Sequence, residues 1–320
     1  MSTTMRLAIP DLISNSYFPA LAAAELGHFE REGIAVTAEL IYPVDRAYMA
    51  LREGIADFVG GSAHAALAAF PQWRGVRLLG ALAQGMYWLL VMRADLKVAR
   101  GDLKALKGGR IGAAPWVEMG LRRLLTAAGL DPGRDQIEIG PVPGATGSKV
   151  NFGLTAAEAL AAGKIDGFWA NGMASELAIT AGVGTIVLDV RRGDGPAGCF
   201  DYTMPVLATT ARLIEHAPDT VAAAVRALVA TQTTLKGDIS SATAVGRRRF
   251  PPREAELIAQ VVRRDLPFYD ATIEQASVLA INAFAKDMSV LADDVPYHEI
   301  VAMQFRHLWP PRQSLVSNRV

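Results

Sequence analysis

The stretch FPALAAAELGHFEREGIAV, residues 18–36, reads as a helix followed directly by a strand. Helical spacing links Leu21, Ala24, Glu25 and Phe29. Gly33 is placed where such a helix would end. Residues 34–41 are rich in valine and isoleucine and predict the next strand. A helix joined to a strand in this way is the repeating unit of an α/β chain.

The same alternation continues on both sides of this stretch. Further strands are expected at residues 5–10, 56–60, 76–82 and 87–93, with a short helix at 47–54 and another starting at Ser62. After residues 103–109 the pattern restarts, with strands expected at 110–113, 137–142, 165–169 and 185–190 and helices at 117–128, 155–162 and 174–181. After Thr210 strands disappear, and helices are expected at 218–236, 252–266, 273–288 and 299–309. This rhythm predicts βαβ units on mostly parallel sheets.

The restart and the later loss of strands predict two lobes. Lobe I is expected to comprise residues 1–94 and 201–320, and lobe II residues 95–200. The outward crossing is expected near residues 93–99, and the return crossing in the glycine-rich segment 191–198. Two crossings between lobes form a hinge of the kind that closes on a ligand. The end of the chain, residues 310–320, is expected to be a loose tail.

Composition excludes several classes of protein. Half of the 320 residues (51%) are hydrophobic and 20% are charged, with a mean hydropathy of +0.22, which is too apolar for a disordered chain. Lys and Arg number 32 and so do Asp and Glu, so the basic surplus of a nucleic-acid binder is missing. Cys199 is the single cysteine, which excludes an intrachain disulfide and a cysteine-rich zinc site. No segment has the ~18 uninterrupted apolar residues of a membrane span.

Four segments resemble the NMT1/THI5-like substrate-binding proteins of ABC importers. They are FPALAAAELGHFEREGIAV (18–36), LREGIADFVGGS (51–62), DLKALKGGRIG (102–112) and ALAAGKIDG (159–167). That group includes binders of nitrate, taurine, aliphatic sulfonates and thiamine pyrimidine precursors. The segments occur in the family's order, and the matched part of the chain spans about residues 5–189, whereas the helical tail carries no matching motif.

The resemblance implies a two-lobed periplasmic-binding-protein fold of type II, which is an α/β fold, with a helical C-terminal part. It also implies a small-molecule ligand held between the lobes, an ABC permease as partner and a periplasmic location, with no cofactor or metal. The N-terminus does not read as a secretory signal, because Pro10, Asp11, Ser14 and Asn15 interrupt any apolar region. A cytoplasmic location is therefore the alternative. We expect a monomer that binds no nucleic acid.

The candidate ligand contacts lie just after expected strands or at expected helix starts. In α/β sheets ligands bind outside the carboxyl ends of the strands, and helix N-termini offer free N–H groups. The candidates are Asn15, Ser16, Tyr17, Ser62, His64, Trp88, Trp116, Glu118, Trp169 and Asn171.

Several candidates have an ordinary structural interpretation as well. Ser14, Asn15 and Ser16 suit a helix N-cap, as does Ser62. Glu118 suits the first turn of a helix, where the helix dipole favours a negative charge. If Glu118 faces the ligand, it indicates a ligand with an amine or a ring N–H.

Aromatic residues are few but gather at the expected site. They make up only 7% of the chain, yet seven fall at expected cleft loops or their edges: Tyr17, Phe18, Tyr87, Trp88, Trp116, Trp169 and Tyr202. Rings supply flat stacking area. A flat, partly apolar organic ligand is favoured over nitrate, with an organic anion as the alternative.

An enzyme on the same fold is the alternative function. Sulfinate desulfinases and the pyrimidine-forming enzymes of thiamine synthesis resemble these binding proteins. A desulfinase of this group uses a cysteine in the loop after the first strand, and Ser16 stands in its place here. A serine needs a neighbouring base to become a nucleophile. No phosphate loop, dinucleotide motif or nucleophile elbow appears, and the five histidines lack metal-ligand spacing. Ligand binding without turnover is therefore the predicted function.

Overall fold

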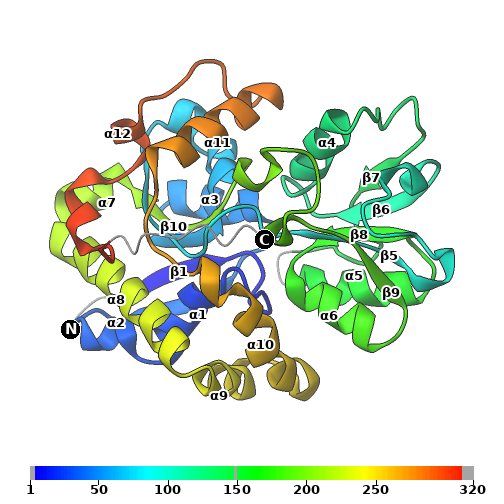
Figure 1. Cartoon of the computed structure of the whole chain (residues 1–320). Coiled ribbons are helices and arrows are strands. Elements are labelled where there is room, and N and C mark those ends of the chain that lie inside the picture. The colour runs from blue at the N-terminus through cyan, green and yellow to red at the C-terminus, as the bar shows by residue number, and fades with distance from the viewer. Residues whose placement is uncertain (1–3, 148–149, 312–320) are drawn as a thin grey trace.

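The computed structural model describes residues 4–147 and 150–311, so residues 312–320 of the expected tail lie outside the described part. It contains two five-stranded sheets, with strand orders β2-β1-β3-β10-β4 and β7-β6-β8-β5-β9. Each sheet forms the centre of one lobe, and the yellow-to-red helices of the tail surround the first (Figure 1). The predicted two-lobed α/β architecture is confirmed, because the βα rhythm that restarts at Arg110 builds a second sheet.

The first sheet gathers strands from both ends of the chain. Its strands are β1 (Met5–Ile9), β2 (Val36–Leu40), β3 (Phe58–Ser62), β4 (Val76–Ala81) and β10 (Pro205–Thr210). β1 pairs in parallel with β2 and β3, whereas β10 lies antiparallel between β3 and β4. β10 was not expected from the sequence, because this apolar run is short and stands just before the helical tail. The sheet is therefore mixed rather than mostly parallel.

The second sheet has the same mixed design. Its strands are β5 (Leu89–Arg93), β6 (Arg110–Ala113), β7 (Glu138–Gly140), β8 (Gly167–Ala170) and β9 (Gly184–Asp189). β6 is parallel to β7 and β8, and β5 runs antiparallel between β8 and β9. In each lobe, the strand that the chain makes directly after crossing is the antiparallel one.

β5 corrects the expected boundary between the lobes. Because β5 pairs with β8 and β9, the chain crosses outward in residues 82–88 and not near residues 93–99. Lobe II thus begins at about Leu89, before the expected residue 95. The return crossing lies in residues 190–204, between β9 and β10, and includes the expected glycine-rich segment.

Most of the expected helices are present with different bounds, but the helices at residues 211–216 and 240–249 were not expected, and a 3-10 helix (Ala63–Ala68) follows Ser62. Lobe I holds α1 (Phe18–Glu25), α2 (His28–Arg31) and α3 (Val44–Arg52), and lobe II holds α4 (Glu118–Ala127), α5 (Phe152–Ala161) and α6 (Gly172–Thr180). The tail forms α7 (Ala211–His216), α8 (Pro218–Gly237), α9 (Ser240–Arg249), α10 (Pro252–Asp265), α11 (Gln275–Asp287) and α12 (Tyr297–Ile300). The single helix expected over residues 18–33 is broken at Gly27, whose φ of +71° is left-handed.

The tail closes over the first sheet because its apolar faces need a partner. α8 packs on α1 and α2, and α12 packs on β4. Trp309 donates its indole N–H to the carbonyl of Leu79 at 2.9 Å. None of the helices in the described ranges is both long enough and apolar enough to cross a membrane.

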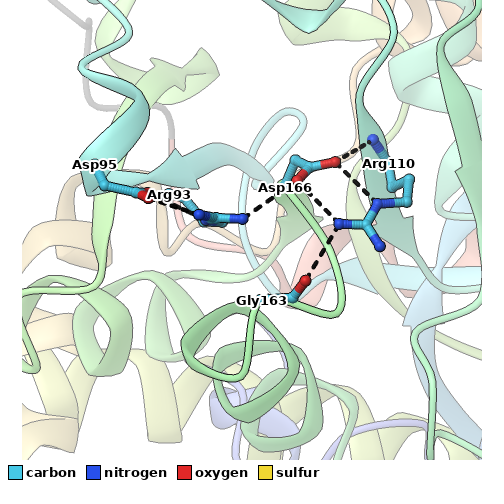
Figure 2. Close-up of polar contacts among 5 residues, drawn as sticks. All are labelled: Arg93, Asp95, Arg110, Gly163 and Asp166. Atoms are coloured by element: carbon cyan, nitrogen blue, oxygen red, sulfur yellow. Dashed lines mark hydrogen bonds and ion pairs between the residues drawn. The ribbon is translucent and has the colours of Figure 1, made fainter.

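A charged cluster lies at the end of the second sheet where β6 and β8 begin. Asp166, just before β8, accepts hydrogen bonds from the Arg110 side chain at 3.0 and 3.1 Å and lies 3.6 Å from Arg93 Nη1 (Figure 2). Arg93 also pairs with Asp95 at 2.6 Å. A surface hollow beside Arg93, Asp95 and Gly163 lies on this edge. Because β6 and β8 begin here, their carboxyl ends, where α/β sheets bind ligands, lie at the opposite edge.

Candidate ligand site between the lobes

The loops that follow the strands of the two lobes meet each other. Asp11 follows β1, and its carboxylate accepts a hydrogen bond from the Asn171 side chain, which follows β8, at 2.9 Å. His64 follows β3 and bonds the carbonyl of Trp116, which follows β6, at 2.9 Å. The lobes are therefore closed on each other at the edge where the sequence places the ligand.

The loop after β1 does not cap helix α1. The N-cap is Tyr17, with no side-chain cap bond, and the hydroxyls of Ser14 and Ser16 are buried without a hydrogen-bond partner among the described residues. The capping interpretation of Ser14, Asn15 and Ser16 is therefore wrong. Asn15 instead donates to Asp265 at 2.5 Å.

Three hydroxyls form a closed triangle at the lobe junction. Tyr17 bonds Tyr87 at 2.5 Å and Ser62 at 3.2 Å, and Ser62 bonds Tyr87 at 2.8 Å. The expected helix-capping role of Ser62 is wrong, because its side chain makes no cap bond and is used in this triangle. Burial raises the pKa of Tyr17 to about 12, so the phenol stays protonated and can donate.

His64 is a fixed, neutral contact between the lobes. A backbone carbonyl only accepts, so the ring nitrogen Nε2 donates to Trp116 at 2.9 Å, and Nδ1 accepts from the Thr203 hydroxyl at 2.9 Å. Burial lowers the pKa of His64 to about 4. Both ring nitrogens are occupied by protein partners, which leaves ring contact as the way for His64 to meet a ligand.

The predicted tryptophans come together around His64. Trp88 packs against His64 at a centroid distance of 6.1 Å and against Trp169 at 6.0 Å. Trp169 is fully buried, and its indole N–H has no partner among the described residues. Trp116 is half-buried and has a φ of +68°, a left-handed conformation that a bulky residue adopts only under constraint. The strained turn presents its carbonyl to His64.

Glu118 and Asn171 stand at helix starts in lobe II, as predicted. Asn171 caps α6 by accepting from the backbone N–H groups of Met173 and Ala174 at 3.0 and 3.3 Å, and its amide donates to Asp11. Glu118 opens α4, and its Oε2 atom is buried without a partner among the described residues. Burial raises the pKa of Glu118.

Unpartnered buried polar atoms concentrate at this junction. Native proteins pair nearly all such atoms, so each exception requires an explanation, such as a missing ligand. Among the described residues they include Ser14 Oγ, Asn15 Oδ1, Ser16 Oγ, Tyr42 OH, Asp45 Oδ1, Tyr48 OH, Glu118 Oε2, Asn151 Oδ1, Trp169 Nε1 and Arg191 Nε.

Sequence reasoning missed several of these residues. Asp11 and Tyr42 lie two residues beyond β1 and β2, so the rule that selected the other candidates could have found them. Arg191 and Asp265 form an ion pair at 2.6 Å with both side chains more than nine-tenths buried. They come from the return crossing and the helical tail, and no local motif predicts their meeting.

The described residues contain no cluster of side chains that could bind a metal ion. Across residues 4–147 and 150–311, no group of three or more histidine, cysteine, aspartate or glutamate side chains is placed to hold a metal ion. Cys199 is buried, and burial raises the pKa of its thiol to about 11.

Comparison with solved structures gives the same fold. The alkanesulfonate-binding protein SsuA from Xanthomonas axonopodis pv. citri, bound to MOPS, matches with a TM-score of 0.71 and 15% identity over 94% of this chain and 99% of that chain. The periplasmic aliphatic sulphonate binding protein SsuA from Escherichia coli matches with 0.63 and 13% over 98% and 94%. A mutant of DSZB in complex with biphenyl-2-sulfinic acid matches with 0.64 and 16% over 96% and 98%.

Sequence comparison identifies the family. No curated protein sequence matches the chain. The family model described as NMT1/THI5 like matches residues 14–234, which is well over half of the 320 residues. The match covers the loop after β1 and continues into the helical tail. This chain belongs to the NMT1/THI5-like family.

Proposed function

We propose that this protein is the solute-binding component of an ABC importer and holds a small organic molecule between its two lobes. The observation that carries the proposal is the concentration of buried, unpartnered polar atoms in both lobes at their junction. A ligand seated there would give these atoms the partners that they lack. Family membership and the sulfonate-binding structures of the same fold support a solute-binding role. The proposal includes a permease as partner and a periplasmic location, with a cytoplasmic location as the alternative.

The rings at the junction favour an organic ligand over nitrate. Tyr42 of lobe I stacks on Phe152 of lobe II at a centroid distance of 6.2 Å and an interplanar angle of 17°. Trp88 and Trp169 add a second aromatic surface. Flat apolar faces with a few polar groups are typical of sites for small organic molecules.

An enzyme of this fold has less support in this chain. DSZB is described as a desulfurization enzyme and matches with a TM-score of 0.62 and 16% identity, so the fold admits catalysis. The candidate nucleophile here is Ser16, whose hydroxyl has no hydrogen-bond partner among the described residues. No base therefore holds its proton in this closed form.

A thermal-shift screen of sulfonates, carboxylates, pyrimidines and aromatic acids tests the proposal. A ligand that binds only the folded protein raises the Tm, and the rise grows with the logarithm of the ligand concentration relative to its Kd. The screen should be run on the wild type and on Tyr48→Phe, which removes an unpartnered hydroxyl at the junction. Tyr297→Phe is the matched control, because that hydroxyl bonds the Ile273 carbonyl in the tail.

The proposal predicts a hit whose shift shrinks in Tyr48→Phe and not in the control, and the ligand should be recovered chemically unchanged after incubation. Recovery of a converted product would contradict it and would favour the enzyme. Equal shifts in both variants would place the ligand elsewhere.

A further inference from the structure

We infer that the ligand carries a cationic nitrogen donor, such as an amidinium or ammonium group, on a flat ring, and that it is not a sulfonate or another strong anion. The inference rests on the proposed function and names the chemical class of its ligand. The evidence is the charge of the side chains at the junction and the presence or absence of protein partners for their polar atoms.

The unpartnered phenol of Tyr42 is influenced electrostatically by three carboxyl groups. Tyr42 is 5% exposed, and its hydroxyl has no partner among the described residues. Burial raises the pKa of Tyr42, and the negative charges of Asp11, Asp45 and Glu118 raise it further. Asp45 Oδ1 and Glu118 Oε2 are themselves buried and unpartnered among the described residues. Both lobes thus supply unpartnered acceptor atoms to the junction.

The unpartnered hydroxyls of the junction can adapt to a donor-rich ligand. Ser14, Ser16 and Tyr48 carry buried hydroxyls without partners among the described residues. A hydroxyl can donate or accept, whereas an ionised carboxylate only accepts. The fixed preference of the site therefore comes from its carboxylates, which require donors from the ligand.

Among the described residues, the arginines near the site have protein partners, although the Nε atom of Arg191 has no hydrogen-bond partner. The positive charge of Arg122 lowers the pKa of Glu118 and so opposes the effect of burial. The Arg122 guanidinium itself donates a hydrogen bond to the Ile139 carbonyl at 2.9 Å. Arg191 is paired with Asp265 at 2.6 Å and donates to the Gln84 carbonyl at 3.1 Å. The Arg191 guanidinium also lies over the rings of Tyr87 and Phe268 at 5.7 and 5.0 Å.

An anionic ligand that binds the Arg191 guanidinium would compete with the Asp265 carboxylate for it. It would also have to approach Asp11, Asp45 and Glu118, whose repulsion is large in a buried site. A cation instead compensates the cost of burying these carboxyls, since removing a charge from water without a partner is expensive. The charge balance therefore favours a cation.

The test compares three probes of similar shape by isothermal titration of the full chain. Benzamidinium is a flat cation, benzamide is its neutral analogue, and benzenesulfonate is a flat anion. We expect saturable binding of benzamidinium, at least about tenfold weaker binding of benzamide, and weaker binding still of benzenesulfonate. Binding of benzamidinium should strengthen from pH 5 to pH 7.5, because Asp11, whose pKa burial raises to about 6, ionises in this range and the probe stays charged.

Variants of the charged residues test which of them contacts the probe. Glu118→Gln should weaken benzamidinium at least about tenfold and leave benzamide nearly unchanged. Asp45→Asn is the second variant, should Glu118→Gln fail to unfold cooperatively. Arg191→Gln tests for an anionic ligand instead, because such a ligand would lose its positively charged partner and bind more weakly.

Two results overturn the inference. Benzenesulfonate binding that exceeds benzamidinium binding and is lost in Arg191→Gln would show an anion site and would leave the proposed solute-binding function intact. Absence of saturable benzamidinium binding at pH 7.5 would also overturn the cationic class. The proposed function would then depend on the outcome of its own thermal-shift screen.

Discussion

The pH dependence of stability should separate two buried groups at the lobe junction that act in opposite directions. Burial raises the pKa of Asp11 from 3.8 to about 6 and lowers the pKa of His64 from 6.5 to about 4. Each difference corresponds to about 3 kcal/mol of unfolding free energy. The two groups therefore titrate over nearly the same pH range.

The signs follow from which state binds the proton. Between pH 4 and 6 folded Asp11 holds a proton that the unfolded chain has released, so stability falls as pH rises through this range. Between pH 6.5 and 4 the unfolded chain protonates His64 and the folded protein does not, so stability falls as pH decreases. The two dependences nearly cancel in the wild type.

Single variants should expose each dependence. For Asp11→Asn, the unfolding free energy relative to wild type should rise by about 3 kcal/mol from pH 4 to pH 7. For His64→Gln it should fall by about 3 kcal/mol over the same range. Taking the difference from wild type removes the contributions of other titrating groups.

Urea unfolding followed by tryptophan fluorescence between pH 4 and pH 7 gives these differences. The double variant is the control, and its difference from wild type should be nearly independent of pH. A flat or falling curve for Asp11→Asn would mean that Asp11 is solvated in solution. In that case the lobes are not closed in the unliganded protein, and the closed junction described above would be wrong as its resting form.

Three further substitutions test the junction. Tyr48→Phe should stabilise the unliganded protein by about 1 kcal/mol and weaken ligand binding, because its buried hydroxyl is unpartnered among the described residues. Tyr297→Phe, the control, should lower the Tm without affecting binding, because its hydroxyl bonds the Ile273 carbonyl. The reverse order of Tm values would contradict this expectation. Trp169→Ala should weaken binding by roughly 1–3 kcal/mol in titration calorimetry, since it removes a buried ring at the site; unchanged affinity would show that the ring does not contact the ligand. Gly172→Ala should lower the Tm, because the added Cβ would lie 3.0 Å from the side chains of Asn15 and Val261, which must then shift by a few tenths of an ångström; an unchanged or raised Tm would refute the expectation.

The fold could be predicted from the sequence because its signals are local. The segment 18–36 shows its helix and strand through residue spacing, and the restart at Arg110 shows the second lobe. The sequence could not predict which sheet the antiparallel strands β5 and β10 join, because each is a short apolar run whose partner strands depend on where the chain crosses between the lobes. For the same reason the boundary between the lobes was placed too late.

The site could be predicted only in part. Asn171 and Glu118 stand at helix starts as expected, because the βα rhythm fixes where such positions fall. Ser62 and Ser16 suit a cap by residue type, but neither one caps a helix. The Ser62 hydroxyl bonds Tyr17 and Tyr87 instead, and the Ser16 hydroxyl is buried without a partner among the described residues. The pairing of Arg191 with a residue of the tail has no sequence signal at all.

The most direct test of ligand binding between the lobes is a crystal structure of the protein with the tightest-binding compound from the screens. The account predicts the compound between the lobes, within hydrogen-bond distance of Tyr42, Tyr48 or Glu118 and against the Trp169 ring. A compound bound in the surface hollow beside Arg93 and Asp95 instead, with the hydroxyls of the junction bonded only to water, would contradict it.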